Sequence, residues 1–363
     1  MKIFFIAPLS PPLTGQSIMN DATLNFLKNN NDVHILNLSS NSLSSHLSIK
    51  KVLTSLQNFF KIIILSNKCD VIYLNISESF FGNLRDLIFY LLLGFRLNKT
   101  YLHLHGGTGY ISIISRYKFF MGLNKFFLRQ AAGVIVLDEI YKNFLINRLG
   151  LKNLHVLPNH AEKDLFLNFI EIKHKFSKNN KLKVIFLSNF LEGKGYLEIL
   201  DAYKSLSKIE QKNILIDFAG NFISEKDRLV FFRSIQPFKS LNYVGLVSEI
   251  QEKRNFLSQA HVLCLPTYYP YEGQPIAILE AYAAGCAVIT TNHASIPNLV
   301  KNNINGYIVE KRSSIDLASA LRKSLNNMDK LESFGLVNNK IARKDFTFNS
   351  YIRSFSNILK LNN

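Results

Sequence analysis

Residues 262–310 read VLCLPTYYPYEGQPIAILEAYAAGCAVITTNHASIPNLVKNNINGYIVE. The apolar run Val262–Leu265 predicts a buried strand of a parallel sheet. A polar loop then leads to a predicted helix over Ile276–Ala284, which Gly285 closes. A second apolar run, Ala287–Thr290, predicts the next buried strand. This strand–loop–helix–strand order indicates an α/β sheet, and ligands of such sheets bind at the carboxyl ends of the strands.

Two glutamates eight residues apart flank the expected start of that helix. Glu272 lies in the loop before it, and Glu280 lies about one turn inside, on the face that should pack. Backbone N–H groups between them favour an anion such as a diphosphate, with help from the helix dipole. These groups come from Gly273, Gln274 and Ile276, because Pro275 has none. The pattern suits a sugar nucleotide, although the dipole alone would also favour acids at a helix start.

Composition bounds the class of protein. The chain has 363 residues, enough for two domains, and a formal net charge of +17. Residues 1–161 are poor in acids, with 16 Lys/Arg and 7 Asp/Glu. This balance favours an anionic partner, either membrane lipid, a phosphate-bearing acceptor or nucleic acid, although AT-rich coding would give similar lysine usage. No apolar run reaches the roughly 18 residues of a transmembrane helix.

Two further observations concern the compartment. Lys2–Ala7 is predicted as a first strand and not a signal segment, because its apolar run is short and no cleavage-like site follows. The cysteines Cys69, Cys264 and Cys286 show neither metal nor disulfide spacing. That usage suits a reducing cytoplasm.

Three residues outside the central stretch lie at the end of an expected strand or in the loop that follows one. Gly15 stands at a loop-to-helix junction, where glycine lets the backbone approach a ligand closely. His105 ends the predicted strand Tyr101–His105 before Gly-Gly, a pattern that a core or turn histidine would also give. His103, two residues earlier, is expected to be structural. Lys194 follows a strand and precedes a helix, which places it to meet a phosphate as a point charge.

Two segments leave alternatives open. Ser115–Gln130 is predicted as one helix in which bases and phenylalanines alternate. It either lies on an anionic membrane surface or packs its phenylalanines on the sheet with its bases toward water. Glu162–Lys181 is polar and basic, and is predicted as a linker or peripheral segment.

The central stretch resembles the donor-binding half of retaining GT-B glycosyltransferases of family 4, also described as glycosyl transferases group 1. The shared features are a strand ending in proline, Glu-Gly, seven residues between the glutamates, the Gly-Cys-Ala-Val run and a late Asn305-Gly306. The resemblance implies an α/β GT-B fold, with two Rossmann-like domains whose parallel sheets face across a cleft. Residues 1–161 would form the acceptor domain and 162–346 the donor domain, and a helix of about 347–363 would pack back on the first.

The resemblance also implies residue roles. His105, Glu272 and Lys194 would be catalytic. The donor would be bound by Gly15, Ser188, Lys194, Gly245, Glu272, Gly273, Gln274, Pro275, Ile276 and Glu280. The family usually has Gly-Arg where this chain has Ser188-Asn189, which removes one cation. The chain has no Asp-x-Asp motif, which suits metal-free transfer, so we expect no metal and no cofactor, and a UDP-sugar donor over a GDP-sugar.

The expected activity is hexosyl transfer to a glycan or a polyprenyl-diphosphate-linked acceptor, in assembly of a bacterial surface polysaccharide such as O-antigen or capsule. Arg116–Arg129 would allow peripheral attachment to the anionic inner face of the cytoplasmic membrane, and no nucleic acid is expected. Within the fold, a sugar-nucleotide epimerase or a starch-type synthase is the runner-up. A different class is a non-catalytic anion-binding protein for nucleic acid or membrane, for which bases and stacking aromatics would share one exposed surface.

Overall fold

The computed structural model describes the backbone of residues 1–39, 49–177 and 181–361, and the side chains of these residues except 49–56. Residues 178–180, inside the predicted linker, lie outside this description. The chain divides into two compact units. One comprises Met1–Asn159 with Asn349–Asn363, and the other His160–Phe348. The sequence had predicted 1–161 with a helix of about 347–363, and 162–346.

The first unit contains a six-stranded parallel sheet in the order β2-β1-β3-β4-β5-β6. Its strands are β1 (Lys2–Ala7), β2 (Asp32–Asn37), β3 (Val71–Asn75), β4 (Thr100–Leu104), β5 (Gly133–Val136) and β6 (Leu154–Val156). Its helices are α1 (Gly15–Asn30), α2 (Ile49–Ser66), α3 (Phe80–Leu93), the short 3-10 helix η1 (Gly94–Lys99), α4 (Thr108–Arg116), α5 (Lys118–Leu128), α6 (Glu139–Leu149) and α16 (Phe348–Leu359).

The second unit has a sheet of the same kind, ordered β12-β11-β10-β7-β8-β9. Its strands are β7 (Leu182–Leu187), β8 (Ile214–Ala219), β9 (Leu241–Gly245), β10 (Val262–Leu265), β11 (Ala287–Thr291) and β12 (Gly306–Val309). Its helices are η2 (Lys163–Leu165), α7 (Phe169–Ser177), α8 (Tyr196–Lys204), α9 (Lys208–Lys212), α10 (Glu225–Ile235), α11 (Ile250–Ser258), α12 (Ile276–Ala283), α13 (Ile296–Leu299), α14 (Ser314–Leu325) and α15 (Met328–Asp345).

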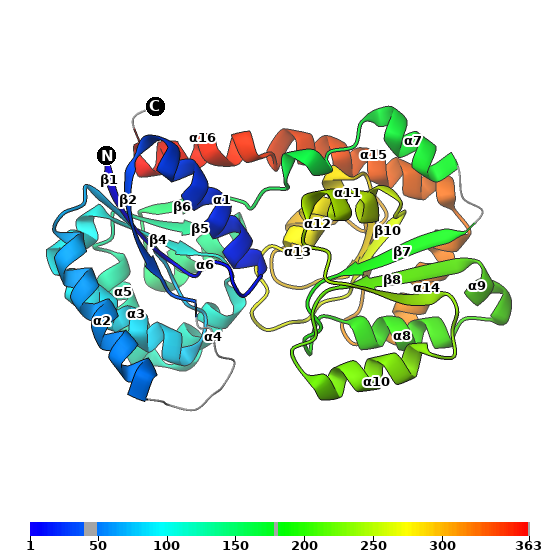
Figure 1. The fold of residues 1–363 in the computed structure, drawn as a ribbon, viewed down its shortest axis with the longest axis horizontal. Coiled ribbons are helices and arrows are strands. Elements are labelled where there is room, and N and C mark those ends of the chain that lie inside the picture. The colour runs from blue at the N-terminus through cyan, green and yellow to red at the C-terminus, as the bar shows by residue number, and fades with distance from the viewer. Residues whose placement is uncertain (40–48, 178–180, 362–363) are drawn as a thin grey trace. The chain divides into compact units, whose positions relative to one another are not determined.

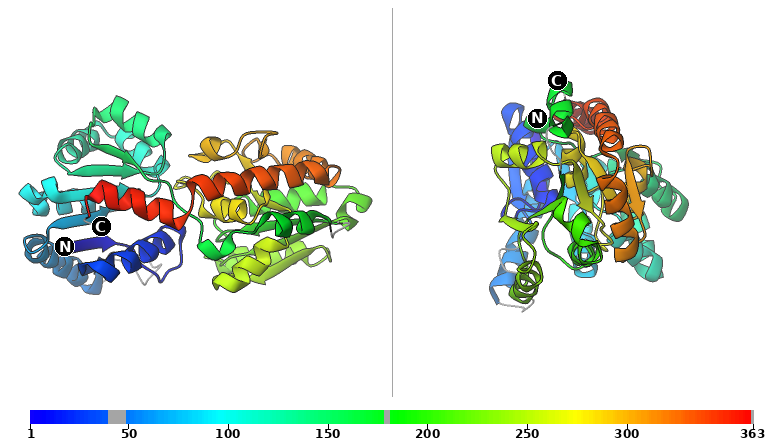
Figure 2. Two further views of the ribbon diagram at one scale, coloured as in Figure 1. Left: turned by 90° about the horizontal axis from the view of Figure 1, so that it is seen from above. Right: turned by 90° about the vertical axis from the view of Figure 1, so that its right-hand side faces the viewer.

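Helices cover both faces of each sheet (Figure 1). Strands buried on both faces need apolar side chains on both, so central strands read as continuous apolar runs. Every residue of β3, β10 and β11 is buried. In the first unit, α16 lies beside α1, where the hydroxyls of Tyr351 and Thr23 are 2.9 Å apart (Figure 2). The predicted α/β class with two parallel sheets is therefore confirmed.

The predicted single helix over Ser115–Gln130 is wrong. The chain takes an extended conformation at Tyr117, which ends α4 and begins α5. The Tyr117 ring contacts Phe80 and Phe120, with ring centroids 5.4 and 6.1 Å apart. Packing between separate helices therefore accompanies a break that local helix periodicity does not reveal.

The predicted linker over Glu162–Lys181 is also wrong, because most of it packs onto the second unit. Ile172 and Phe176 of α7 belong to the buried core of that unit. A Cβ added at Gly285 would lie 2.6 Å from the Ile172 side chain, so the helix packs directly against this glycine. The segment contains many charged residues, so its few apolar positions did not indicate a packed helix in the sequence.

Candidate functional site

The site predicted in the second unit is built around the start of α12. The loop after β10 brings Glu272 to this helix end, and the first N–H groups of a helix have no partner within it. Glu272, Gln274 and Glu280 are only 6%, 6% and 4% exposed. Buried polar side chains at a helix N-terminus make a setting in which an anion can be bound.

Lys194 and Glu272 form an ion pair at this helix start. The Lys194 Nζ lies 2.8 Å from Oε2 of Glu272, and the hydroxyl of Thr267 donates to the same oxygen at 2.8 Å. The ammonium also lies 4.6 Å from the centre of the Tyr269 ring. The sequence predicted both residues for the site without pairing them, and the structure brings the two side chains into direct contact.

Two glycines allow the Lys194 loop to reach the end of β10. Gly193 and Gly195 have φ values of +89° and +88°, which side chains with a Cβ rarely adopt. A Cβ on Gly195 would lie 2.5 Å from the carbonyl oxygen of Pro266, and one on Gly193 would lie 3.0 Å from the Cα of Tyr269. The Gly-Lys-Gly sequence thus permits a close backbone approach that presents the lysine to the α12 start.

Glu280 is held by a lysine that the sequence reading missed. The Lys253 Nζ of α11 lies 2.7 Å from Oε1 of Glu280, and both side chains are buried. Glu162 is near this pair: burial raises the pKa of its carboxyl, Lys253 opposes that rise and Glu280 adds to it. Lys253 stands among charged residues of a polar helix, so the sequence gave no sign that its side chain is buried.

Side chains at or after the end of β11 hold the loop between β10 and α12 in place. Ser295 Oγ donates to the carbonyl of Gly273 at 2.7 Å, and the Thr291 hydroxyl donates to the carbonyl of Thr267. His293 Nε2 lies 2.8 Å from the Tyr269 carbonyl oxygen. These residues directly follow or end a strand, which is the one signal by which a sequence reading could have found them.

Other predicted donor residues lie at neighbouring strand ends. Ser188 follows β7 and its N–H donates to the carbonyl of Ala219 at 3.1 Å. Gly245 ends β9, and its carbonyl accepts from the N–H of Gly220 at 2.9 Å. Asn305 is structural instead, because its buried amide donates to the Tyr282 hydroxyl at 2.8 Å and to the Leu299 carbonyl at 3.0 Å.

The first unit carries the two remaining predicted residues. Gly15 is the first residue of α1, whose N-cap Thr14 accepts from the N–H of Ser17 at 3.1 Å. His105 follows β4 and stacks on His103, with ring centroids 3.8 Å apart. The Tyr73 hydroxyl lies 2.6 Å from Nδ1 of His103 and 3.3 Å from Nε2 of His105.

A carboxylate from the loop after β3 holds the turn after His105. Oε2 of Glu78 accepts from the N–H groups of Gly107 and Gly109 at 2.7 and 3.2 Å. These donors stand at the start of α4, so Glu78 acts as an N-terminal cap supplied from a distant part of the chain. The sequence reading missed Glu78 and Tyr73, because only the sheet brings β3 and β4 together.

Both histidines are neutral in the folded unit. Burial lowers the pKa of His105 to about 3. Burial, and then the neighbouring His105, lower the pKa of His103 as well. A neutral imidazole at His105 adds no positive charge next to a reacting sugar that itself becomes positive.

Acid should therefore destabilise the protein through these histidines. The unfolded chain binds protons below about pH 6.5, whereas folded His105 stays neutral down to a pKa of about 3. The free energy of unfolding should fall as the pH drops through this window, by at most about 1.4 kcal/mol per pH unit for each histidine. Denaturant unfolding of wild type and His105→Asn over this range measures it. The variant should show a shallower slope, and equal slopes would contradict the neutral assignment.

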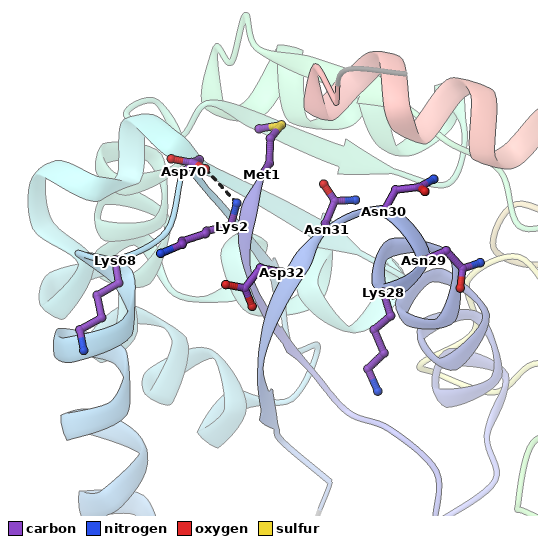
Figure 3. Close-up of a pocket in the computed structure, with 9 residues that line it drawn as sticks. All are labelled: Met1, Lys2, Lys28, Asn29, Asn30, Asn31, Asp32, Lys68 and Asp70. Atoms are coloured by element: carbon purple, nitrogen blue, oxygen red, sulfur yellow. Dashed lines mark hydrogen bonds between the residues drawn. The ribbon is translucent and has the colours of Figure 1, made fainter.

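A separate surface hollow lies in the first unit, at the amino ends of β1 and β2 (Figure 3). It measures 720 Å³ and is lined by polar and charged residues, among them Lys2, Lys28, Asp32 and Asp70. The Lys2 N–H donates to Asp70 at 2.8 Å. Ligands of parallel sheets bind at the opposite strand ends, so we do not assign the donor to this hollow.

Two features of the described residues bear on the sequence predictions. No described group of three or more His, Cys, Asp or Glu residues is arranged to hold a metal ion. Metal-independent transfer stays a prediction. No described helix combines the length and apolarity needed to cross a bilayer.

Comparison with known proteins supports this description. Residues 168–339 match the family model for glycosyl transferases group 1. The capsular polysaccharide biosynthesis glycosyltransferase CapH of Staphylococcus aureus is 26% identical over 52% of this chain and 52% of its own length. An α-1,4-N-acetyl-D-galactosaminyltransferase of Campylobacter jejuni, whose name includes a glycan linked to undecaprenol, is 27% identical over 58% of this chain and 54% of its own length. This chain thus spans about half of each of these relatives.

A solved structure extends the likeness to the whole fold. The crystal structure of Anabaena HepE in complex with UDP superposes with a TM-score of 0.76, covering 99% of this chain and 100% of that one at 14% identity. The likeness therefore concerns the fold and not the substrates. The chain has the GT-B fold, and its residues 168–339 match the family of glycosyl transferases group 1.

Proposed function

We propose that this glycosyltransferase moves a hexose from a nucleoside-diphosphate sugar to a hydroxyl of a glycan or lipid-linked acceptor, with retention at the anomeric carbon and without a metal ion. The observation that carries the proposal is the buried Lys194–Glu272 pair at the start of α12, with Glu280 inside the same helix. A nucleoside diphosphate needs a cation and N–H groups for its phosphates and carboxylates for its hydroxyls.

The proposed roles follow from these positions. Lys194 and the N–H groups at the α12 start stabilise the charge that grows on the leaving diphosphate. Glu272 accepts hydrogen bonds from the donor sugar, and Glu280 accepts them from the ribose. The acceptor hydroxyl attacks the anomeric carbon from the leaving-group side. The C–O bond to the diphosphate breaks, and the leaving phosphate takes the hydroxyl proton.

His105 and Gly15 have proposed roles from the first unit. A neutral His105 contacts the sugar and stabilises positive charge at the anomeric carbon through its imidazole dipole. Gly15 gives the diphosphate close access to the backbone. Neither role rests on a contact within the second unit, so each needs its own variant, His105→Ala or Gly15→Val, assayed for transfer and for donor binding.

The relatives support the choice of substrates. The Anabaena structure contains UDP, which favours UDP over GDP as the carrier here. The names of the two bacterial relatives refer to capsular polysaccharide and to an undecaprenol-linked glycan. We propose a comparable acceptor for this chain, in assembly of a bacterial surface polysaccharide.

A thermal-shift panel should identify the donor. A ligand that binds only the folded protein at 100 times its dissociation constant stabilises it by about 2.7 kcal/mol. UDP-sugars should raise the melting temperature more than GDP-, ADP- or dTDP-sugars, and excess EDTA should leave the shift unchanged. NMR of the product anomer then tests retention, and free epimerised donor would instead identify an epimerase. No shift with any sugar nucleotide would reject the proposed function.

A further inference from the structure

An exposed apolar stripe runs along α3 and into η1 in the first unit. Phe81, Leu84, Ile88, Leu91 and Phe95 follow one another at spacings of three and four residues, the period of one helix face. All five are exposed, Phe81 at 81% and Phe95 at 98%. The opposite face of α3 already packs into the core through Phe89, Tyr90 and Leu93. The stripe therefore adds nothing to the core of this unit.

The neighbouring helices extend the stripe. The helices α2 and α5 both contact α3, and all three lie on the side of the sheet away from α1 and α16 (Figure 1). Exposed large apolar residues on them are Phe60 and Ile64 of α2 and Phe119 and Phe126 of α5. Rings join α3 to α5, since Phe80 lies 5.0 Å from Phe120, which lies 6.0 Å from Phe119. We call this surface of α2, α3, η1 and α5 the basic aromatic face, because lysines and arginines of the same segments accompany these apolar side chains.

The phenylalanines of α5 divide between two environments. Phe120 and Phe127 pack partly against the core, whereas Phe119 and Phe126 are 72% and 62% exposed. The sequence left open a core-packing or a membrane-facing helix, and in the structure α5 packs only part of its phenylalanines on the core. The exposed half is the part that needs a partner.

The charge around this face has one sign. Between Glu78 and Asp138 the sequence contains seven Lys or Arg residues and a single acid, Asp86. Asp86 is fully buried and paired with Arg85 at 2.7 Å. Exposed cations stand on α2, η1, α4 and α5 or directly after α5, and they include Lys61, Lys99, Arg116, Lys118 and Arg129.

We propose that the basic aromatic face docks on the surface of an anionic lipid bilayer. Phenylalanines and aliphatic side chains enter the boundary between headgroups and acyl chains, while the surrounding cations meet anionic headgroups. A second copy of the same face would bring like charges together, which disfavours a dimer. The aliphatic stripe from Leu84 to Leu91 offers little for nucleic-acid bases to stack on.

This inference deepens the proposed function, because an acceptor linked to a lipid is held at such a surface. It does not depend on the donor chemistry, since vesicle binding is measured without any sugar nucleotide. If the protein binds vesicles but no sugar nucleotide, the proposed function is wrong and this inference stands. If the protein binds sugar nucleotides but no vesicles, this inference is wrong and the proposed function stands.

Vesicle co-sedimentation tests the proposal on the full chain. Wild type should bind vesicles containing about one-third phosphatidylglycerol at least tenfold more strongly than pure phosphatidylcholine vesicles, and raising the salt to about 0.5 M should weaken the binding. Phe81→Ser/Phe119→Ser should reduce the partition coefficient at least tenfold on anionic vesicles. Lys99→Glu/Lys118→Glu should do the same and also remove the lipid preference.

Matched variants of the second unit serve as controls. Phe169→Ser/Ile170→Ser removes two side chains that are also exposed, at 58% and 76%. Lys208→Glu/Lys226→Glu makes the same charge change at exposed lysines of α9 and α10. Both controls should bind vesicles like wild type. Equal losses in test and control pairs, wild-type binding in the test pairs, or a dimer that dissociates in Phe81→Ser/Phe119→Ser would each overturn the proposal.

Discussion

Replacing Lys194 with alanine should lower kcat for sugar transfer by about 10²- to 10³-fold, the usual cost of removing one group that stabilises transition-state charge. The lysine is the cation in direct contact with the start of α12, through its 2.8 Å pair with Glu272. Its side chain is 13% exposed, so water screens its charge little. Steady-state kinetics with the donor identified by the thermal-shift panel measures the effect.

A second lysine of the same sheet provides the matched control. Lys183 pairs with Asp217 at 3.4 Å, but it stands near the amino end of β7, whereas the proposed site lies at the carboxyl ends. Lys183→Ala should keep kcat within about twofold, because surface-type ion pairs contribute at most about 1 kcal/mol to stability and nothing to this site. If Lys194→Ala retains wild-type kcat, Lys194 does not carry the leaving-group charge.

Local sequence constraints explain why the loop between β10 and α12 was placed correctly in the fold. The Gly-Lys-Gly run around Lys194 and the Glu272-Gly273 pair each follow a strand, and short-range patterns specify such loops. The second sheet and both glutamates were therefore placed in the expected element. Burial of Glu280 agrees with its position on the packed face of α12.

Contacts between distant segments explain what was missed. Lys253 meets Glu280 across 27 residues, and Glu78 meets Gly107 across 29. Neither the pattern of α11 nor that of the loop after β3 indicates these partners. The break at Tyr117 and the packing of α7 on Gly285 have the same origin, since tertiary contacts override local helix patterns. The sequence predicted fewest side-chain contacts in the first unit, because its histidine cluster assembles from β3 and β4.

Variants of the buried pair of Lys253 and Glu280 should show whether the pair contributes to protein stability, to donor binding, or to both. Removing one partner of a buried pair typically costs about 3–5 kcal/mol, because the other charge stays buried alone. Lys253→Met and Glu280→Leu should each lower the free energy of unfolding of the second unit by about this amount. The double variant should recover most of the loss, since apolar side chains of similar volume replace both charges. Denaturant unfolding of all four proteins gives the coupling energy.

Donor binding should not recover in the double variant. If Glu280 accepts bonds from the ribose, its loss removes a hydrogen bond to a charged group, about 1.5–3 kcal/mol, or roughly 10- to 100-fold in donor KM. A donor lacking the ribose hydroxyls should discriminate further, because wild type would bind it poorly and the double variant would bind both donors alike. Recovery of donor KM together with stability would mean that Glu280 only anchors Lys253. A raised donor KM together with recovered stability would show that Glu280 binds the ribose and that Lys253 offsets the cost of burying its carboxylate.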